Sequence, residues 1–320
     1  MPLQPALSDE FVAITQGRVR FAEPMRLHTT FHIGGPAEIW AEPQDEEELC
    51  ELLKVAREGG LALTLIGGGA NLLVRDEGIP GLVIHLGNPS FQRYQPFDEL
   101  RANGVEGLGT GMVVAGAGLP LEWLIRKAGQ GALSGVEFLA GVPGRVGGAL
   151  RMNAGTHDEE GKTHSFSDVV RSVTVMDREG QVRELSKERV GFGYRSTHLE
   201  GQTVLKVTLG LIPDDAQAID QRVKRLWAFK RKTQDWTAPS AGCIFKNPSQ
   251  GQAAGWMIER AGLKGHGIGG AAISAVHANF IMNLGNARAQ DVLGLIEEVQ
   301  TRVKRLFGVE LELELQVVPV

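Results

Sequence analysis

The sequence predicts an α+β protein of more than one domain, and three observations support this fold class. The chain has 320 residues, whereas a single domain usually takes ~100–200. Segments with helical and strand-like hydrophobic spacing occur along its whole length. Glycine is the third observation, because 42 residues are Gly, roughly twice the usual share of ~7%. So much glycine indicates turns, or places where the backbone approaches a ligand closely.

The first ninety residues follow an α/β pattern. Residues 45–59 predict a helix, because leucines repeat at helical spacing, acidic residues fill the first turn and two glycines end it. The apolar run at 61–66 predicts a buried strand, which leads into Gly67-Gly68-Gly69-Ala70-Asn71. A second strand is expected at 81–86.

The remaining elements are shorter, and glycine separates many of them. Glycines scattered between 104 and 118 predict turns between short strands, and the densest glycine stretch is Gly141–Gly155. The following list gives the other expected elements: strand 112–115, helix 123–128, a hairpin of 168–176 with 181–185, a linker at 213–215, helices 216–232, 253–261 and 289–307, strands 271–276 and 279–282, and a final strand 311–318.

The composition excludes several classes of protein. Hydrophobic residues make up 42% and charged residues 22% of the chain, which is ordinary for a globular protein and too apolar for a disordered one. Glycine without a Gly-X-Y period excludes collagen. The net charge of −5 without a basic tract makes nucleic acid an unexpected partner.

We also expect a cytoplasmic protein without membrane insertion. No apolar run approaches the ~18–20 residues of a membrane span, and residues 1–18 lack the charged-then-apolar pattern of a signal peptide. The only two cysteines, Cys50 and Cys243, cannot build a disulfide framework or a zinc site.

The two dense glycine stretches, Gly67–Gly69 and Gly141–Gly155, are candidate ligand loops. Glycines after a buried strand expose backbone N–H groups to a phosphate without a Cβ in the way, although a tight turn explains one such loop equally well. A small polar residue, Asn71 or Asn153, accompanies each stretch. Two loops of this kind favour a dinucleotide diphosphate over a simple turn.

Other motifs point less clearly to a ligand. The first loop has Leu72 where a dinucleotide fingerprint needs its third glycine. Gly265–Gly270 has the formal G-x-G-x-x-G spacing, but it follows a helix rather than a strand. No Walker motif is present, and His157 and His164 in a polar loop make a weak metal candidate.

Six motifs in order resemble the UDP-N-acetylenolpyruvoylglucosamine reductase family of peptidoglycan precursor synthesis. They are Thr30-Phe31-His32-Ile33-Gly34-Gly35-Pro36-Ala37, Leu65 through Val74, Gly141 through Gly155, Gly191-Phe192-Gly193-Tyr194-Arg195-Ser196, Ser240 through Pro248, and His277-Ala278-Asn279-Phe280-Ile281. Each motif alone is weak evidence, whereas six in one order, from about Leu27 to Gln316, are specific.

The resemblance implies a two-subdomain FAD-binding fold of the vanillyl-alcohol-oxidase/PCMH type, plus a separate α+β substrate-binding domain. We expect FAD-binding subdomain 1 at residues 1–88, subdomain 2 at 89–212 and the UDP-sugar domain at 213–309. A C-terminal strand, 310–320, is expected to return to the FAD-binding part. By the same resemblance the cofactor is FAD, and the substrates are NADPH and UDP-N-acetylglucosamine enolpyruvate. We expect a monomer or a weak dimer without a metal.

The family's site residues carry over by motif position. The expected cofactor-binding residues are Ile66, Gly67, Gly68, Gly69, Ala70, Asn71, Leu72, Gly141, Pro143, Gly144, Gly147, Gly148, Asn153, Ala154 and Gly155. The expected substrate-binding residues are Tyr194, Lys246 and Asn247, and the expected catalytic residues are Arg195, Cys243 and Glu314. In the family an Arg and a Glu stabilise an enolate, and a Ser donates a proton.

Position 243 departs from that pattern because it holds Cys instead of Ser. A thiol, with an ordinary pKa of ~8.5, is a stronger acid than an alcohol and suits proton donation. Its reactivity also predicts sensitivity to oxidation or alkylation where the thiol is accessible. The alternative is a small buried hydrophobic residue, which is also our interpretation of Cys50.

Arg195 and Glu314 also have plain structural alternatives. Without its motif, Arg195 would be interpreted as a surface arginine. Glu310, Glu312 and Glu314 alternate along one predicted strand, and by periodicity alone they form a solvated face. The family pattern selects the last of the three.

The resemblance also predicts the subclass. One subclass of the family closes a tyrosine lid over the substrate, but no Tyr lies between Arg195 and Ser240, so we expect the shorter, lidless subclass. Two alternatives remain: an oxidase of the same fold, and a non-catalytic flavin or nucleotide carrier.

Overall fold

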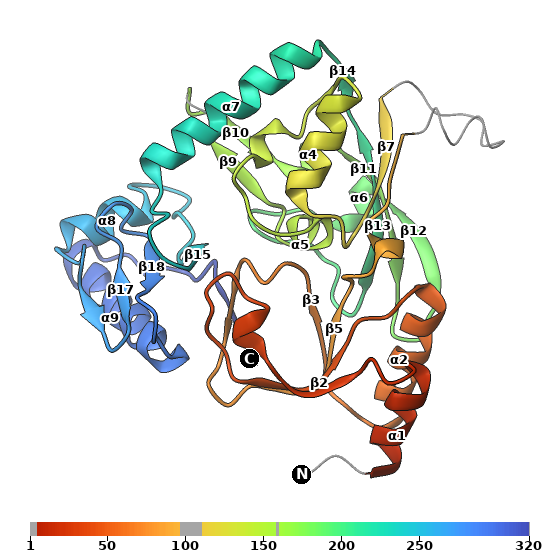
Figure 1. Ribbon diagram of the computed structural model, residues 1–320. Helices are drawn as coiled ribbons and strands as arrows, with labels where there is room; N and C mark the ends of the chain where they lie inside the picture. Colours follow the sequence, from red (N-terminus) through yellow and green to blue (C-terminus); the bar gives the residue numbers. More distant parts are fainter. Residues whose placement is uncertain (1–4, 97–110, 158–159, 320) are drawn as a thin grey trace. The chain divides into compact units, whose positions relative to one another are not determined.

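The computed structural model describes residues 5–96, 111–157 and 160–319 (Figure 1). The chain folds into two compact units. Unit 1 comprises residues 1–20, 39–67 and 81–229, and unit 2 comprises residues 21–38, 68–80 and 230–320. The division falls within β1 (Arg20–Pro24), β2 (Pro36–Ala41), β5 (Ile79–His85) and α7 (Ala216–Thr233). The four segments expected from the sequence follow chain order, and that division stays a prediction.

Unit 1 contains the larger sheet. Its elements are α1 (Pro5–Ile14), α2 (Glu46–Glu58), β3 (Leu63–Ile66), η2 (Pro89–Phe91), β6 (Tyr94–Pro96), β7 (Met112–Gly116), α4 (Leu121–Gln130), β8 (Leu133–Ser134), η3 (Glu137–Leu139), α5 (Val146–Arg151), β9 (Gly155–His157), β10 (Thr163–Ser165), η4 (Phe166–Asp168), β11 (Val170–Met176), β12 (Val182–Ser186), α6 (Lys187–Val190), β13 (Thr203–Gly210) and β14 (Ile212–Pro213). Five strands form an antiparallel sheet in the order β12-β11-β13-β7-β6.

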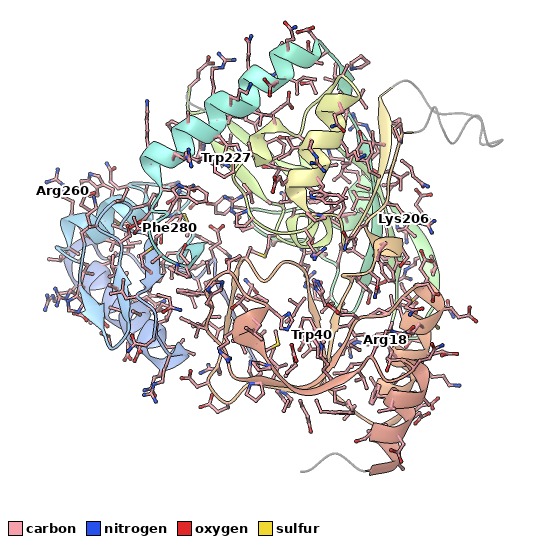
Figure 2. The ribbon with its side chains drawn as sticks, in the orientation of Figure 1. Arg18, Trp40, Lys206, Trp227, Arg260 and Phe280 are labelled. Carbon is pink, nitrogen blue, oxygen red and sulfur yellow. The ribbon has the colours of Figure 1, made fainter. Side chains whose placement is uncertain are left out.

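Apolar side chains from this sheet pack with α4 and α5 into one core, and α5 contacts β7 and β13. A second core joins α1, α2 and β5. Trp40 of β2, labelled in Figure 2, is buried in this unit and stacks on His85 with ring centroids 5.5 Å apart.

Helix α2 shows how local sequence determines an element. Asp45 caps it, because the carboxylate accepts hydrogen bonds from the backbone N–H groups of Glu47 and Glu48 at 3.1 and 2.9 Å. Its apolar stripe is buried and includes Leu49 and Leu52, each fully shielded from solvent. The expected helix 45–59 is therefore confirmed. Strand β3 pairs in parallel with β5, which confirms the α/β beginning.

Unit 2 is built around a smaller sheet. Its elements are η1 (Met25–Leu27), β4 (Leu72–Val74), β15 (Ser240–Cys243), α8 (Ala254–Arg260), β16 (Gly267–Ile268), β17 (Ala271–Ile273), β18 (Phe280–Asn283), α9 (Ala289–Phe307) and β19 (Gln316–Val318). The sheet order is β15-β18-β17-β16. Helix α9 packs on β16 and β17, and apolar residues of α8 and α9 fill the core.

Most expected elements are confirmed within a few residues, but the final strand needs correction. The expected strand 311–318 is regular only at β19 (Gln316–Val318), which pairs in parallel with β4. The break arises because the Ile244 carbonyl accepts hydrogen bonds from both Glu314 N and Leu315 N, at 2.9 and 3.2 Å. The second glycine stretch contains a helix, α5 (Val146–Arg151), which the sequence does not predict because glycine has a low helix propensity.

The scattered glycines are confirmed as turn residues at two of the three described positions. Gly111 and Gly118 lie in turns, whereas Gly116 ends β7. A Cβ on Gly116 would lie 2.1 Å from the Phe91 carbonyl oxygen, and one on Gly118 would lie 2.0 Å from that of Leu86. Glycine at these positions allows backbone segments to cross closely. Residues 104–110 lie outside the described residues.

Candidate active site

The first glycine loop connects β3 to β4. Ile66 ends β3 and is buried, Leu72 begins β4, and Gly67, Gly68, Gly69, Ala70 and Asn71 lie between them. Gly69 has φ +61°, and a Cβ there would lie 2.0 Å from the His28 carbonyl oxygen. The Gly69 carbonyl also accepts a hydrogen bond from Thr30 N at 3.1 Å. Gly69 therefore lets the chain cross its own backbone.

The second glycine stretch surrounds α5. Gly141, Pro143 and Gly144 form the loop before the helix, and Gly141 and Gly144 have φ values of 73° and 125°. Gly147 N–H donates to the Ala117 carbonyl at 2.8 Å, and a Cβ on Gly147 would lie 3.0 Å from the Ala117 Cβ. This glycine serves helix packing, and its N–H already has a partner.

The two stretches meet at Gly67 and Gly148. A Cβ on Gly67 would lie 3.6 Å from both N and Cα of Gly148, and a Cβ on Gly148 would meet nothing within 4 Å. The surface between them is thus bare backbone next to open space. These residues fit the diphosphate of a dinucleotide, because a phosphate needs close approach to the backbone.

Arg195 lies in a tight turn of unit 1. Gly193 and Ser196 pair across the turn, with Gly193 N donating to the Ser196 carbonyl at 3.0 Å. Arg195 has φ 54°, a left-handed conformation that costs a non-glycine residue roughly 1–2 kcal/mol. Its Nη2 donates to the Gly155 carbonyl at 2.8 Å, and its guanidinium lies 5.4 Å from the centre of the Tyr194 ring. The half-buried cation therefore has a defined position on a strained backbone.

Asn153, expected as a cofactor contact, uses its side chain inside the protein. It is buried, its Nδ2 donates to the Gly193 carbonyl at 2.9 Å, and its Oδ1 accepts from Ser167 N at 3.0 Å. Ala154 N bonds back to the Ala149 carbonyl at 2.8 Å. The end of the second stretch is thereby joined to the Arg195 turn.

Cys243 lies at the end of β15 in unit 2. It pairs with Phe280 of β18, and a register shift separates it from the pairing of Ser240 with Met282. It is half-buried and forms no disulfide. The backbone on its C-terminal side is held by Asn279, whose side chain bonds to both N and O of Phe245, at 2.9 and 2.8 Å.

The segment that carries Glu314 runs beside the Cys243 segment. Lys246 N donates to the Glu312 carbonyl and Glu314 N to the Ile244 carbonyl, both at 2.9 Å. Leu313 forms a bridge with Phe245 between them. Residues about seventy positions apart in the sequence are thus neighbours in unit 2.

The three alternating glutamates do not share one environment. Glu310 is exposed and forms an ion pair with Lys304, whereas exposed Glu312 lies 3.3 Å from the Lys246 ammonium. Glu314 is half-buried. Its carbonyl accepts a hydrogen bond from Asn71 Nδ2 at 2.9 Å. Exposure therefore separates the expected catalytic glutamate from its two neighbours.

The expected substrate residues lie near these groups in their own units. Tyr194 is 54% exposed beside Arg195. Lys246 is an ion-pair partner of Glu312, and the side-chain oxygen of Asn247 accepts a hydrogen bond from Ala254 N at 3.0 Å, at the start of α8. Asn247 thus also orders the local backbone.

Unit 2 holds two further titratable residues, buried Lys230 and half-buried His277, that the sequence alone does not mark as site residues. Burial lowers the pKa of Lys230 to about 8, and it also lowers the pKa of His277. In the sequence, His277 and Asn279 stand out only as members of a family motif. Lys230 gives no sequence signal of burial, because it lies in a basic helix beside Arg231 and Lys232.

The motifs that gave weaker signals have structural roles. In Gly265–Gly270, the backbone N–H of Gly270 donates to the Asp291 carboxylate at 3.1 Å, and a Cβ on Gly269 would lie 2.4 Å from that carboxylate. His157 bonds with Thr163 across the β9–β10 pair. Among the described residues, no group of three or more His, Cys, Asp or Glu side chains is placed to hold a metal ion.

The helices were also compared with the requirements of a bilayer span, which are length and apolar character. In the part of the chain that the structure describes, none of them combines the length and the apolar character that a bilayer span requires.

Comparison with known proteins agrees with this arrangement. A profile of the FAD binding domain matches residues 37–186, and a profile described as UDP-N-acetylenolpyruvoylglucosamine reductase, C-terminal domain, matches residues 234–318. The chain is 41% identical to the UDP-N-acetylenolpyruvoylglucosamine reductase of Heliobacterium modesticaldum, over 92% of this chain and 89% of that protein. It is also 41% identical to the same-named protein of Desulfosudis oleivorans, over 95% and 96%.

A solved structure is similar over nearly the whole chain. The UDP-N-acetylenolpyruvylglucosamine reductase of Thermus caldophilus superimposes with a TM-score of 0.77 at 37% identity, covering 94% of this chain and 99% of that one. The expected fold, an α+β protein with an FAD-binding part and a further domain, is confirmed. The protein is an FAD-dependent oxidoreductase. It belongs to the UDP-N-acetylenolpyruvoylglucosamine reductase family and acts in peptidoglycan precursor synthesis.

Proposed function

We propose that this enzyme uses NADPH to reduce the enolpyruvyl ether of UDP-N-acetylglucosamine enolpyruvate, giving UDP-N-acetylmuramate. The observation that carries the proposal is the pairing of two distant segments in unit 2. Glu314 N bonds to the carbonyl of Ile244, the residue that follows Cys243. The Cys243 thiol and the Glu314 carboxyl group therefore lie on adjacent backbone segments. This arrangement suits a reaction in which a proton is added to the substrate carbon next to the substrate's own carboxylate.

FAD is held, in this proposal, at the bare backbone of Gly67 and Gly148. The absence of side chains there allows the diphosphate to approach the main chain. When bound, FAD carries a hydride from NADPH to the terminal methylene carbon of the enolpyruvyl group. NADP⁺ leaves before the UDP-sugar enters.

Arg195 is assigned to the charge that hydride addition creates. Negative charge develops on the neighbouring carbon and spreads into the carboxylate as an enolate. A guanidinium fixed by its bond to the Gly155 carbonyl can stabilise that charge without rearranging. In our assignment Glu314 also helps to stabilise this enolate.

Cys243 is assigned as the proton donor. Its S–H bond breaks as the proton passes to the enolate carbon, and the resulting thiolate takes a proton from solvent before the next turnover. The overall balance is one NADPH and one proton consumed for each lactyl ether and NADP⁺ formed. Lys246 and Asn247 are assigned to the UDP-sugar, with the Lys246 ammonium suited to its phosphates.

NADPH oxidation tests the function directly. The FAD-loaded enzyme should oxidise NADPH rapidly only with UDP-N-acetylglucosamine enolpyruvate present, and UDP-N-acetylmuramate should accumulate in equal amount. Without substrate, reoxidation by oxygen should be slow. Rapid oxygen-driven turnover would indicate an oxidase instead, and a protein that takes up no FAD would contradict the flavoenzyme assignment.

Replacement of Cys243 tests the proton donor. In Cys243→Ala we expect flavin reduction by NADPH within about twofold of the unchanged enzyme, while product formation falls about 10²–10⁴-fold, the range for a lost general acid. Cys243→Ser should recover part of the rate. Rapid-mixing absorbance at the flavin band separates the two half-reactions.

Cys50→Ala is the matched control. Cys50 packs in unit 1 against Gly180, where a Cβ would lie 2.2 Å from its sulfur, and the variant should keep both half-reactions. Alkylation should inactivate the enzyme only while Cys243 is present. If Cys243→Ala turns over normally, Cys243 has no part in the mechanism.

A further inference from the structure

Each glycine stretch contains an asparagine whose side chain is bonded to the segment of a proposed catalytic residue. We propose that Asn71 and Asn153 are positioning residues, which hold Glu314 and Arg195 in place, rather than ligands of the cofactor. The inference rests on the proposed function, since it concerns the roles of Glu314 and Arg195 in that reaction. Each half of it is carried by contacts within a single unit.

Both the nitrogen and the oxygen of the Asn153 side-chain amide form hydrogen bonds within the protein. The amide donates to the Gly193 carbonyl at 2.9 Å and accepts from Ser167 N at 3.0 Å, and the residue is 7% exposed. In return, Arg195 Nη2 donates to the Gly155 carbonyl at 2.8 Å. Residues 153–155 and 193–195 are therefore joined twice, once at each end, with the catalytic guanidinium as one of the two links.

The backbone of Asn153 has a separate role that must be distinguished from this link. Asn153 follows α5 with φ 39°, its N bonds to the Leu150 carbonyl, and Ala154 N bonds to the Ala149 carbonyl. This is the left-handed termination that closes many helices, and glycine fulfils it best. A helix end alone would therefore favour glycine, whereas the link to Gly193 requires a side-chain amide.

Asn71, in the part of the first glycine loop that belongs to unit 2, holds Glu314 of the same unit. Its Nδ2 donates to the Glu314 carbonyl at 2.9 Å, and its own carbonyl accepts from Gln316 N at 3.0 Å. Glu314 N donates to the Ile244 carbonyl. Hydrogen bonds thus fix Glu314 by both its N–H and its carbonyl, between the Cys243 segment and the first glycine loop.

A second donor reaches the same carbonyl. Gln316 Nε2 lies 3.2 Å from the Glu314 oxygen but is exposed, so water can replace it. Asn71 provides the shorter and more shielded bond. Gln316 is therefore a suitable control for Asn71, because both side chains donate a hydrogen bond to the Glu314 carbonyl.

The test uses Asn71→Asp and Asn153→Gly. Aspartate keeps the shape of Asn71 but turns an acceptor toward the Glu314 carbonyl, and glycine keeps the helix end while removing the link. We expect FAD affinity, followed by flavin fluorescence, and flavin reduction by NADPH to stay within about twofold. Reoxidation of the FAD-saturated enzyme by the enolpyruvyl UDP-sugar should fall about 10- to 100-fold, because small misplacements of catalytic groups have effects of this size.

Control variants test whether the asparagines act through the proposed partners. Gln316→Ala should leave reoxidation within about twofold. In a Glu314→Gln background, Asn71→Asp should add less than about a twofold loss, and in an Arg195→Lys background Asn153→Gly should do the same, because coupled residues are not additive.

Amide hydrogen exchange supplies a readout that does not depend on turnover. Asn71→Asp should speed exchange in peptides covering 312–316 and leave those covering 191–196 unchanged. Asn153→Gly should show the reverse pattern. Such selectivity is expected only when each link is local.

Three outcomes overturn the proposal. A large loss of FAD affinity with normal reoxidation at saturating FAD makes the asparagines cofactor ligands. Equal losses in both half-reactions, or additive losses in the double variants, make their role a general structural one. An unchanged enzyme without any substrate-dependent turnover overturns the proposed function itself, and the assigned roles with it.

Discussion

The glycines of the two loops differ in what lies opposite them. In the first loop Gly69 faces its own chain, since a Cβ would lie 2.0 Å from the His28 carbonyl. In the second stretch Gly148 faces open space, since a Cβ would meet nothing within 4 Å. The two stretches look alike in sequence, but one glycine is required by the fold and the other leaves room for a ligand.

The two units also hold their proposed catalytic residues differently. Arg195 in unit 1 is held by its guanidinium and lies on a left-handed backbone at φ 54°. Glu314 in unit 2 is held by its main chain, and its φ is not positive. Strain is therefore concentrated at the arginine, where the backbone is bent to present the cation, which is typical of functional sites.

The glycine comparison can be tested with one methyl group at each position. We expect Gly69→Ala to lower the free energy of unfolding by about 3–5 kcal/mol, because overpacking adds to left-handed strain. Gly148→Ala should leave the unfolding free energy of the apoprotein unchanged or raise it by about 0.5–1 kcal/mol, since alanine favours helix. Denaturant unfolding of the apoprotein measures both.

The same pair separates folding from FAD binding. Gly148→Ala should weaken FAD binding about tenfold or more, because the methyl group fills the space assigned to the ligand, while Gly69→Ala that has folded should bind FAD nearly normally. Unchanged FAD affinity in Gly148→Ala would show that the open space beside α5 is not the cofactor surface.

The strain at Arg195 predicts a trade between stability and activity. Arg195→Gly should raise the unfolding free energy by about 1 kcal/mol, since glycine adopts positive φ without cost. It should slow reoxidation by the enolpyruvyl UDP-sugar about 10²–10³-fold, as expected for loss of a charge-stabilising donor. Glu314→Gly, on a relaxed backbone, should lose activity without gaining stability. Equal stability changes in the two variants would remove the contrast between the units.

Local pattern predicted much of this molecule. Helices α2 and α9 were expected from apolar spacing that the folded chain buries along one face, and both glycine stretches were located by composition. The parallel pairing of β4 with β19 joins residues 72–74 to 316–318. No periodicity reveals a partner so distant in the chain, so the sequence does not indicate β4 and predicts a final strand longer than β19.

The asparagines illustrate a second limit. Beside glycine loops, Asn71 and Asn153 predict ligand contacts, because phosphate sites use small polar side chains. In the fold their amides face carbonyl groups of Glu314 and Gly193. Sequence indicates which groups can donate a hydrogen bond, whereas only the packed chain determines the acceptor. The motif positions of Arg195, Cys243 and Glu314 came from family resemblance, and their roles remain proposals.

The two units also differ in the titratable group that each one buries, and the pH dependence of stability tests this difference. In unit 1, burial raises the pKa of Glu137, but hydrogen bonds from Gly135 N–H, Ser134 and Arg222 outweigh it and lower the pKa. In unit 2, burial lowers the pKa of Lys230 to about 8 from 10.5. In both cases the unfolded chain binds more protons, so stability rises with pH, below about pH 5 for the glutamate and between about 8 and 10.5 for the lysine.

We therefore expect the free energy of unfolding to rise by up to about 3 kcal/mol between pH 8 and 10.5 through Lys230, at ~1.4 kcal/mol per pH unit. Lys230→Met should abolish that rise, because the titrating ammonium is then absent. Glu137→Gln, the control in unit 1, should keep the alkaline rise and lose part of the acid-side dependence. Denaturant melts at half-unit pH steps measure both slopes, and an alkaline slope that survives in Lys230→Met would assign it to other groups.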